Sequence, residues 1–217
     1  MGAADRHLDL GCGKFPRNPY QRAQLCGIDI RPLSADGFEY RIANLALQPI
    51  PWPDASFESV SAFDFIEHIP RLLPSADGND TIFPFVRLME EIWRVLVPGG
   101  RFYALTPAWP HADAFTDPTH LNIITEHTHD YFCGESPLAR MYGFHGRFRP
   151  LRVDWVRIRD AYAARPDAPE NHGKWPPLKR AARWLRHASR RLRGKPDASL
   201  PPKHYLLWEL EAIKSTP

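Results

Sequence analysis

Residues 107–120 gather side chains that can accept a proton or hold a metal ion. His111, Asp113, Asp117 and His120 stand close together in a polar stretch that also contains Pro118. A histidine can take a proton from a hydroxyl group while that oxygen reacts, and the same residue types can instead bind a divalent ion. Asp117 before Pro118 can also simply form a turn. The sequence leaves these roles open. We name His120, His111 and Asp117 as candidates for catalysis and predict no metal centre.

A second group of residues indicates a cofactor. His7-Leu8-Asp9-Leu10 is a short, largely apolar run that ends in Gly11-Cys12-Gly13. This pattern predicts a buried parallel strand and a turn that lets a ligand approach the backbone. Asp29 ends a second apolar run about 20 residues on, where a carboxylate can accept hydrogen bonds from both hydroxyls of a ribose. We therefore expect a nucleoside-containing cofactor at the carboxyl edge of a parallel sheet.

Apolar segments between turn residues predict the strands that position these groups. We expect strands near residues 7–10, 25–30, 39–43, 59–63, 101–106, 151–159 and 204–213. An apolar face at helical spacing predicts a helix over 85–96, with Pro84 in its first turn and Pro98-Gly99-Gly100 ending it. The prolines of residues 14–24 predict a loop or a single short helical turn in place of a long helix.

Residues 108–140 are predicted to form an active-site loop, because they leave the carboxyl end of the strand over 101–106. Within them we expect a short helix over 125–132 that is capped by Thr125 and leaves His127 and His129 at the surface. Residues 161–202 form a second insertion, between the last two strands. Its segment 178–193 has the pattern of a basic helix, which favours a solvated or partner-bound face, with an anionic membrane surface as the alternative.

Composition sets limits on the whole chain. The 217 residues are 43% hydrophobic, which fits a single globular domain over residues 1–217. The net charge of +3 is too small to argue for a nucleic-acid partner. Three cysteines without close pairing fit a reducing cytoplasm. The sequence contains no apolar run long enough to predict a transmembrane helix.

Five segments, in order, resemble the motifs of class I S-adenosylmethionine-dependent methyltransferases of type 11. They are Asp9-Leu10-Gly11-Cys12-Gly13, Gly27-Ile28-Asp29, the Pro51–Val60 stretch, Phe65-Ile66-Glu67-His68-Ile69 and the Glu91–Gly100 stretch. Together they cover roughly half of the chain. The ordered set is far more specific than any one of the segments.

The resemblance implies a doubly wound α/β fold with a seven-stranded, mostly parallel sheet whose last strand is antiparallel. It implies S-adenosylmethionine as cofactor. The residues expected to contact the cofactor are Asp9, Gly11, Cys12, Gly13, Asp29, Ile30, Asn44, Leu45, Asp64 and Phe65. Glu67 and His68 are expected to have a structural role in the first turn of the next helix.

The expected reaction is O-methylation of a sugar, a glycan or another small-molecule hydroxyl, with His120 as the favoured base by its resemblance to Asp-Pro-Thr-His stretches of related enzymes. Two alternatives stay open: a non-catalytic subunit that binds S-adenosylmethionine, and a methyltransferase acting on RNA or protein. A nucleotide-dependent oxidoreductase is disfavoured, because the longer glycine fingerprint and a Tyr-x-x-x-Lys pair are absent from the sequence.

Overall fold

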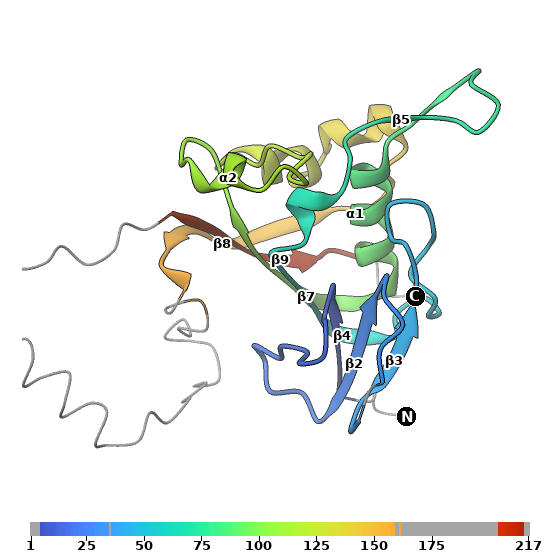
Figure 1. The fold of residues 1–217 in the computed structure, drawn as a ribbon, viewed down its shortest axis with the longest axis vertical. Helices are drawn as coiled ribbons and strands as arrows, with labels where there is room; N and C mark the ends of the chain where they lie inside the picture. Colours follow the sequence, from blue (N-terminus) through green and yellow to red (C-terminus); the bar gives the residue numbers. More distant parts are fainter. Residues whose placement is uncertain (1–4, 35, 159–160, 162–203, 215–217) are drawn as a thin grey trace, which may run out of the picture.

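A seven-stranded sheet organises the residues that the structure, a computed structural model, describes: 5–34, 36–158, 161 and 204–214 (Figure 1). Its strands follow the order β3-β2-β1-β4-β7-β9-β8. They are β1 (Arg6–Leu10), β2 (Gln24–Asp29), β3 (Glu39–Ile42), β4 (Phe57–Phe63), β7 (Leu96–Pro107), β8 (Phe148–Val156) and β9 (Tyr205–Ala212).

The predicted mostly parallel sheet is confirmed. β1 pairs in parallel with both β2 and β4, and β4 pairs in parallel with β7. β9 lies antiparallel between β7 and β8. The chain runs outward from β1 toward β3 and then returns to β4 on the other side of β1. In such sheets a ligand binds in the crevice at this reversal, outside the carboxyl ends of the strands.

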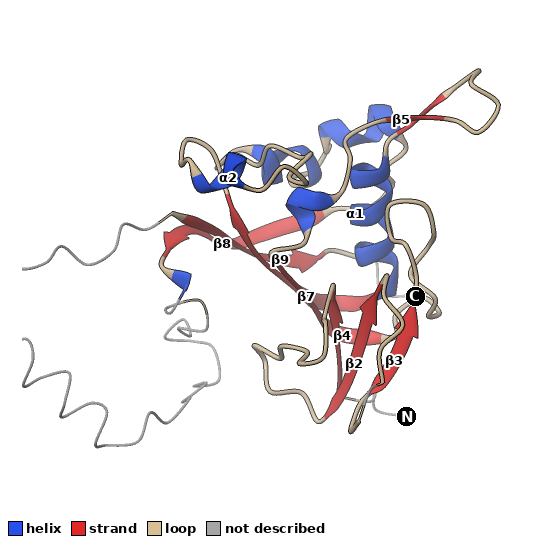
Figure 2. Cartoon of the chain, in the orientation of Figure 1, coloured by secondary structure: helices blue, strands red, loops and turns tan. Residues whose placement is uncertain are grey.

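One face of the sheet is covered by α1 (Pro84–Val95), which lies against the strands in Figure 2. Its apolar residues recur at helical spacing, so that Leu88, Met89 and Ile92 are buried in the main core. The helix ends at Val95 because Leu96 is already extended. The expectation that Pro98-Gly99-Gly100 ends the helix is wrong: β7 begins at Leu96 and runs through these residues, with Gly99 at a φ of +75°.

The opposite face is covered by the predicted loop over residues 14–24. Arg17 places its guanidinium 4.7 Å from the centre of the Phe63 ring, and Tyr20 donates a hydrogen bond to Glu209 at 3.1 Å. A buried polar network lies beneath this loop. The two ring nitrogens of His7 contact the hydroxyls of Ser59 and Ser61, each at 2.8 Å. The Ser61 hydroxyl donates to Asp9 at 2.6 Å.

Burial of His7 predicts a pH-dependent stability. Burial lowers the pKa of His7 from 6.5 to about 3, so the unfolded chain binds one more proton than the folded chain between these values. His7 therefore removes stability as the pH falls below 6.5, by up to about 1.4 kcal/mol per pH unit. Burial raises the pKa of Asp9 to about 6, which adds stability as the pH falls through the range below 6.

His7→Asn keeps hydrogen-bonding groups for both serines and removes the titrating ring. We expect the variant to be less stable than the parent near neutral pH and the difference to shrink as the pH falls from 6.5 toward 4. Urea unfolding at a series of pH values measures this difference in the free energy of unfolding. A difference that stays constant over that range would contradict a neutral, buried His7.

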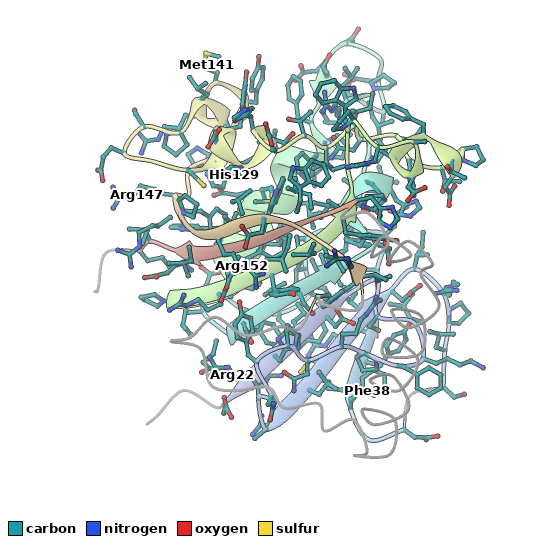
Figure 3. All side chains as sticks on the ribbon, turned by 90° about the vertical axis from the view of Figure 1, so that its left-hand side faces the viewer. Arg22, Phe38, His129, Met141, Arg147 and Arg152 are labelled. Carbon is teal, nitrogen blue, oxygen red and sulfur yellow. The ribbon has the colours of Figure 1, made fainter. Side chains whose placement is uncertain are left out.

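Residues between β7 and β8 form a cap over the carboxyl side of the sheet, with α2 (Asp113–Thr116) and the 3-10 helices η2 (Thr128–Phe132) and η3 (Leu138–Tyr142). The predicted helix over 125–132 is shorter than expected and begins at Thr128. Thr125 caps the turn before it as expected: its hydroxyl accepts the His127 N–H at 3.3 Å, and its own N–H donates to the Thr128 hydroxyl at 2.9 Å. His127 is exposed as expected. His129 is buried, 6.0 Å from the ring of Trp208, and is not a surface residue (Figure 3).

After β4 the chain forms a single 3-10 turn, η1 (Ile66–His68), and then a small antiparallel hairpin of β5 (Leu73–Pro74) and β6 (Thr81–Ile82), where a loop was expected. The hairpin projects beyond α1 in Figure 1. The insertion over 161–202, apart from Ala161, and its basic segment 178–193 lie outside the described residues. Among the residues described, none of the helices has the length and apolar character needed to cross a bilayer.

Candidate active site

The glycine turn after β1 depends on the absence of side chains. Gly11 and Gly13 have φ values of +63° and +56°, a region that favours glycine. A Cβ atom on Gly11 would lie 2.5 Å from the ring of Phe65. On β2, a Cβ atom on Gly27 would lie 2.6 Å from the sulfur of Cys12. The turn therefore stays narrow and presents backbone groups at the sheet edge.

Asp29, at the end of β2, joins this turn. One carboxylate oxygen accepts the Gly13 N–H at 3.1 Å, and Arg31 adds a two-pronged contact, with its Nε and Nη2 each 3.0 Å from the carboxylate. Burial opposes ionisation of Asp29, but the hydrogen bonds from Arg31 and Gly13 lower its pKa overall. The carboxylate is therefore ionised and oriented, and the exposed Arg31 guanidinium contacts both of its oxygens.

Arg31→Ala is expected to tighten nucleoside binding. The substitution frees both Asp29 oxygens from an exposed ion pair that a ribose would have to displace, which predicts an increase in affinity of about two- to fivefold. Isothermal titration of the variant with S-adenosylhomocysteine measures it. Weaker binding by the variant would mean that Arg31 holds the ligand directly.

Two exposed apolar side chains lie at the carboxyl edge of the sheet, next to the glycine turn and Asp29. Ile30, after β2, and Ile42, at the end of β3, are 60% and 57% exposed, an unusual state for two isoleucines on neighbouring strand ends. A flat adenine ring is the kind of group that covers such side chains. Asn44 follows β3, but its side-chain oxygen accepts the Ala46 N–H at 3.1 Å. Leu45 packs into the core instead of facing the edge.

Asp9 and Cys12 support the turn from inside. Asp9 is fully buried and accepts the Arg17 N–H at 2.8 Å, which ties the loop over residues 14–24 to β1. The Cys12 thiol packs against Gly27, and burial raises its pKa to about 12. Both side chains thus hold the backbone around the glycines and do not open toward solvent.

Asp64 ends β4 at the same edge. It has a φ of +48°, an uncommon value for a residue other than glycine, and its N–H donates to Leu105 on β7 at 2.9 Å. Burial raises the pKa of its carboxyl, and Tyr205 lies beside it. Strained residues of this kind gather at functional sites. Phe65 follows, half-buried over Gly11.

Next to Asp64, three further side chains form the acid-histidine cluster: Glu67, His68 and His120. One potential ligand atom of each lies within 4.8 Å of the others. The two histidine rings meet edge to face at 4.8 Å. Glu67 is buried, its carboxylate accepts the Thr106 hydroxyl at 2.9 Å, and burial raises its pKa to about 7. The site therefore groups an acid and two imidazoles beside the sheet edge.

The three catalytic candidates from the sequence do not all lie together. His120 belongs to the cluster. Asp117 has one oxygen 4.0 Å from His120 Nε2 and uses the other to accept the Thr119 N–H and hydroxyl. His111 lies elsewhere, with its ring 5.0 Å from that of Trp155 and 6.2 Å from that of His204. The structure thus separates the two candidate histidines, and it places His120, the favoured base, in the cluster.

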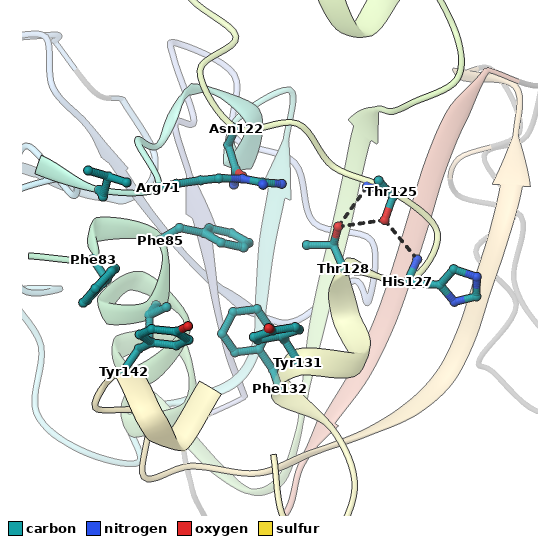
Figure 4. A pocket seen from close by; sticks show the side chains of 12 residues that line it. Arg71, Phe83, Phe85, Asn122, Thr125, His127, Thr128, Tyr131, Phe132 and Tyr142 are labelled. Carbon is teal, nitrogen blue, oxygen red and sulfur yellow. Dashed lines mark hydrogen bonds between the residues drawn. The ribbon is translucent and has the colours of Figure 1, made fainter. Parts of the chain in front are cut away.

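A cavity of about 570 Å³, called here the aromatic cavity, lies between α1 and the 3-10 helices η2 and η3 (Figure 4). It is lined mainly by rings from α1, η2, η3 and the segment before α1: Phe83, Phe85, Tyr131, Phe132 and Tyr142. Arg71 and Asn122 form its polar side, joined by a hydrogen bond of 2.8 Å. The Asn122 N–H donates to the Glu67 carbonyl at 2.9 Å, so the cavity wall is continuous with the cluster.

Sequence reasoning missed the aromatic cavity and the grouping of Glu67 and His68 with His120. Glu67 and His68 were expected in the first turn of the next helix, but they form the isolated 3-10 turn η1, and α1 begins only at Pro84. Their partner His120 is about 50 residues away in sequence. No local pattern indicates that contact. The one available signal was that Phe65-Ile66-Glu67-His68-Ile69 resembles a motif of the methyltransferase family.

The fold and this edge define an α/β protein that binds a nucleoside cofactor. The residues fit such a group, because a narrow glycine turn, an oriented acid and two uncovered isoleucines lie on neighbouring strand ends. Residues 8–104 match the family model described as a methyltransferase domain. Over these residues the chain is similar to class I S-adenosylmethionine-dependent methyltransferases, and S-adenosylmethionine is the methyl donor that this match supports.

Solved structures share this fold at low sequence identity. The methyltransferase of Haloferax volcanii in complex with the activator Trm112 is 16% identical, with a TM-score of 0.53 over 97% of this chain and 84% of that chain. A SAM-dependent methyltransferase from Archaeoglobus fulgidus is 14% identical, with a TM-score of 0.53 over 95% of this chain and 85% of that chain. No curated protein sequence matches the chain.

Proposed function

We propose that the protein transfers a methyl group to a hydroxyl oxygen of a small molecule or glycan. The observation that carries the proposal is the acid-histidine cluster, which stands next to Asp64 at the carboxyl end of β4. A hydroxyl is a weak nucleophile while it keeps its proton, so its methylation needs a group that takes the proton or stabilises the oxygen. Glu67, His68 and His120 offer such groups.

When bound, S-adenosylmethionine supplies an electrophilic methyl group on a positively charged sulfur. The protein's task is then to hold, orient and desolvate the reactants. Asp29 would hold the ribose, and Ile30 and Ile42 would cover the adenine. The carboxyl group of Asp64, which follows β4 at the same edge, would favour a cationic ligand over its uncharged product.

The aromatic cavity supports an acceptor of modest size. Its volume of about 570 Å³ lies in the range of small-molecule sites, and its flat ring faces suit a ring-bearing acceptor. Arg71 and Asn122 can orient polar substituents, and they connect directly to the turn that carries Glu67. Asn122 thus links the cavity wall to the backbone of Glu67, a member of the acid-histidine cluster.

The test is methyl transfer from S-adenosylmethionine with a deuterated methyl group to a panel of acceptors. The panel contains methyl glycosides, a catechol, ethanolamine, transfer RNA and a denatured protein, with products located by mass spectrometry and NMR. The expected product carries the label on the oxygen of a glycoside or catechol. Label only on nitrogen, RNA or protein would overturn the proposal.

A matched pair of variants on η3 tests the acceptor site. Tyr142→Ala removes a ring from the aromatic cavity and is expected to raise the acceptor KM, while Met141→Ala, on the exposed neighbour, leaves it unchanged (Figure 3). Equal effects of the two changes would place the acceptor elsewhere.

We also place the reaction in the cytoplasm, supported by the free thiols of Cys12, Cys26 and Cys133. A contact between segment 178–193 and an anionic membrane stays a prediction of the sequence.

A further inference from the structure

Hydrogen bonds hold the side chains of the acid-histidine cluster and leave a lone pair free on one nitrogen of each histidine and on one oxygen of Glu67. His120 Nδ1 lies 3.2 Å from the Ala114 carbonyl oxygen. A carbonyl oxygen only accepts hydrogen bonds, so Nδ1 carries the hydrogen and Nε2 keeps its lone pair. The protein thus fixes the tautomer of His120 in the manner common for histidines that bind metal ions.

Two linked hydrogen bonds, through Thr119 to Asp117, fix His68 in the same tautomer, with its hydrogen on Nδ1. The Thr119 hydroxyl donates its one hydrogen to Asp117 at 2.7 Å. Its oxygen must therefore accept the contact with His68 Nδ1, at 2.9 Å, which places the ring hydrogen on Nδ1. His68 Nε2 is left with a free lone pair. Asp117, a candidate for catalysis in the sequence, orients His68 through Thr119.

Glu67 completes the arrangement. The residue is 1% exposed, and while Oε2 accepts the Thr106 hydroxyl, Oε1 is buried without a hydrogen-bond partner. A buried carboxylate oxygen without a partner costs free energy unless a proton, a water molecule or a cation meets it. Asp64 and Asp117 add further negative charge around the cluster.

From this geometry we propose that Glu67, His68 and His120 bind one divalent transition-metal ion. Two imidazole nitrogens and one carboxylate oxygen form a ligand set that suits Zn²⁺ and neighbouring ions and leaves coordination positions open. Ligands about 2.1 Å from an ion lie about 3.3 Å apart, so the three atoms must close by up to about 1.5 Å on binding. Rotation of the side chains covers such a distance.

The role of the ion rests on the proposed function. An open position would take the acceptor hydroxyl, whose acidity rises when its oxygen meets the ion. The hydroxyl proton then leaves to water. The oxygen forms its bond to the methyl carbon as the carbon–sulfur bond breaks and its electron pair stays on sulfur. No oxidant or reductant is needed.

The experiment titrates the untagged full chain, stripped with a chelator, with Zn²⁺ by calorimetry and with Co²⁺ by visible absorption. We expect one strong site per chain. His68→Ala and His120→Ala should each weaken Zn²⁺ binding at least about tenfold. His145→Ala removes a histidine whose side chain is 82% exposed and which lies outside the cluster, and should bind as the parent does. Circular dichroism checks that each variant is folded.

Absence of a strong site, or binding unchanged in both His68→Ala and His120→Ala, would overturn the metal site. Methyl transfer to a hydroxyl by metal-free chain at the parent rate would overturn the role of the ion and leave the proposed function standing. One Zn²⁺ per chain, lost in both variants, supports the site even if methylation of hydroxyl groups is never found. The two proposals therefore fail separately.

Discussion

Asp29→Ala is expected to weaken binding of S-adenosylhomocysteine at least about 100-fold. A carboxylate that holds two ribose hydroxyls makes two charge-assisted hydrogen bonds, each contributing roughly 1.5 kcal/mol or more. In the structure this carboxylate is ionised, buried and tied to Gly13 of the glycine turn. Alanine would remove both the acceptor oxygens and the bond that orients the turn. Calorimetric titration of the variant against the parent measures the loss.

Two controls make this loss specific. Asp154→Ala removes an exposed carboxylate that pairs with Arg152 on β8, far along the sheet order from β2, and should bind as the parent does. Arg31→Ala should change the affinity in the opposite direction to Asp29→Ala. Parent-like affinity in Asp29→Ala would show that the ribose is held elsewhere.

His120→Ala is expected to lower the rate of methyl transfer by about 100-fold or more, with the affinity for S-adenosylhomocysteine within about twofold of the parent. The ring lies in the acid-histidine cluster, at the end of β4, and not in the part of the edge that holds the ribose. The rate is measured as labelled methyl transferred to the acceptor found with the panel above.

His111→Ala is the informative comparison, because His111 lies against Trp155 and His204 and outside the cluster. We expect its rate to stay close to that of the parent. The reverse result, with His111→Ala inactive and His120→Ala active, would contradict the assignment. It would show that methyl transfer takes place near Trp155 of β8 and not at the acid-histidine cluster.

Local sequence patterns predicted the strands and the glycine turn at this edge of the sheet. The sequence predicted that the Gly11-x-Gly13 turn and Asp29 lie at one edge of the sheet. In the structure the Gly13 N–H donates a hydrogen bond to the Asp29 carboxylate. This follows because two adjacent parallel strands bring their carboxyl ends to one edge, so strand and turn signals suffice. The loop over 14–24 was also foreseen, since its prolines interrupt a helix.

Predictions that depended on tertiary contacts were less successful. His129 has the local pattern of a surface residue but packs against Trp208 of β9. The Pro98-Gly99-Gly100 stretch has the composition of a helix stop, yet β4 pairs with Leu96 and with Arg101 across a register irregularity that takes these residues into the strand. The acid-histidine cluster joins η1 to a distant loop. In each case packing between remote segments decided the outcome.

The most direct measurement for the account as a whole is calorimetric titration of the parent chain with S-adenosylmethionine, S-adenosylhomocysteine and NAD. The glycine turn, Asp29 and the uncovered Ile30 and Ile42 predict micromolar binding of both sulfur nucleosides and no binding of NAD. Binding of NAD without binding of either sulfur nucleoside would contradict the assignment of this edge as a methyl-donor site.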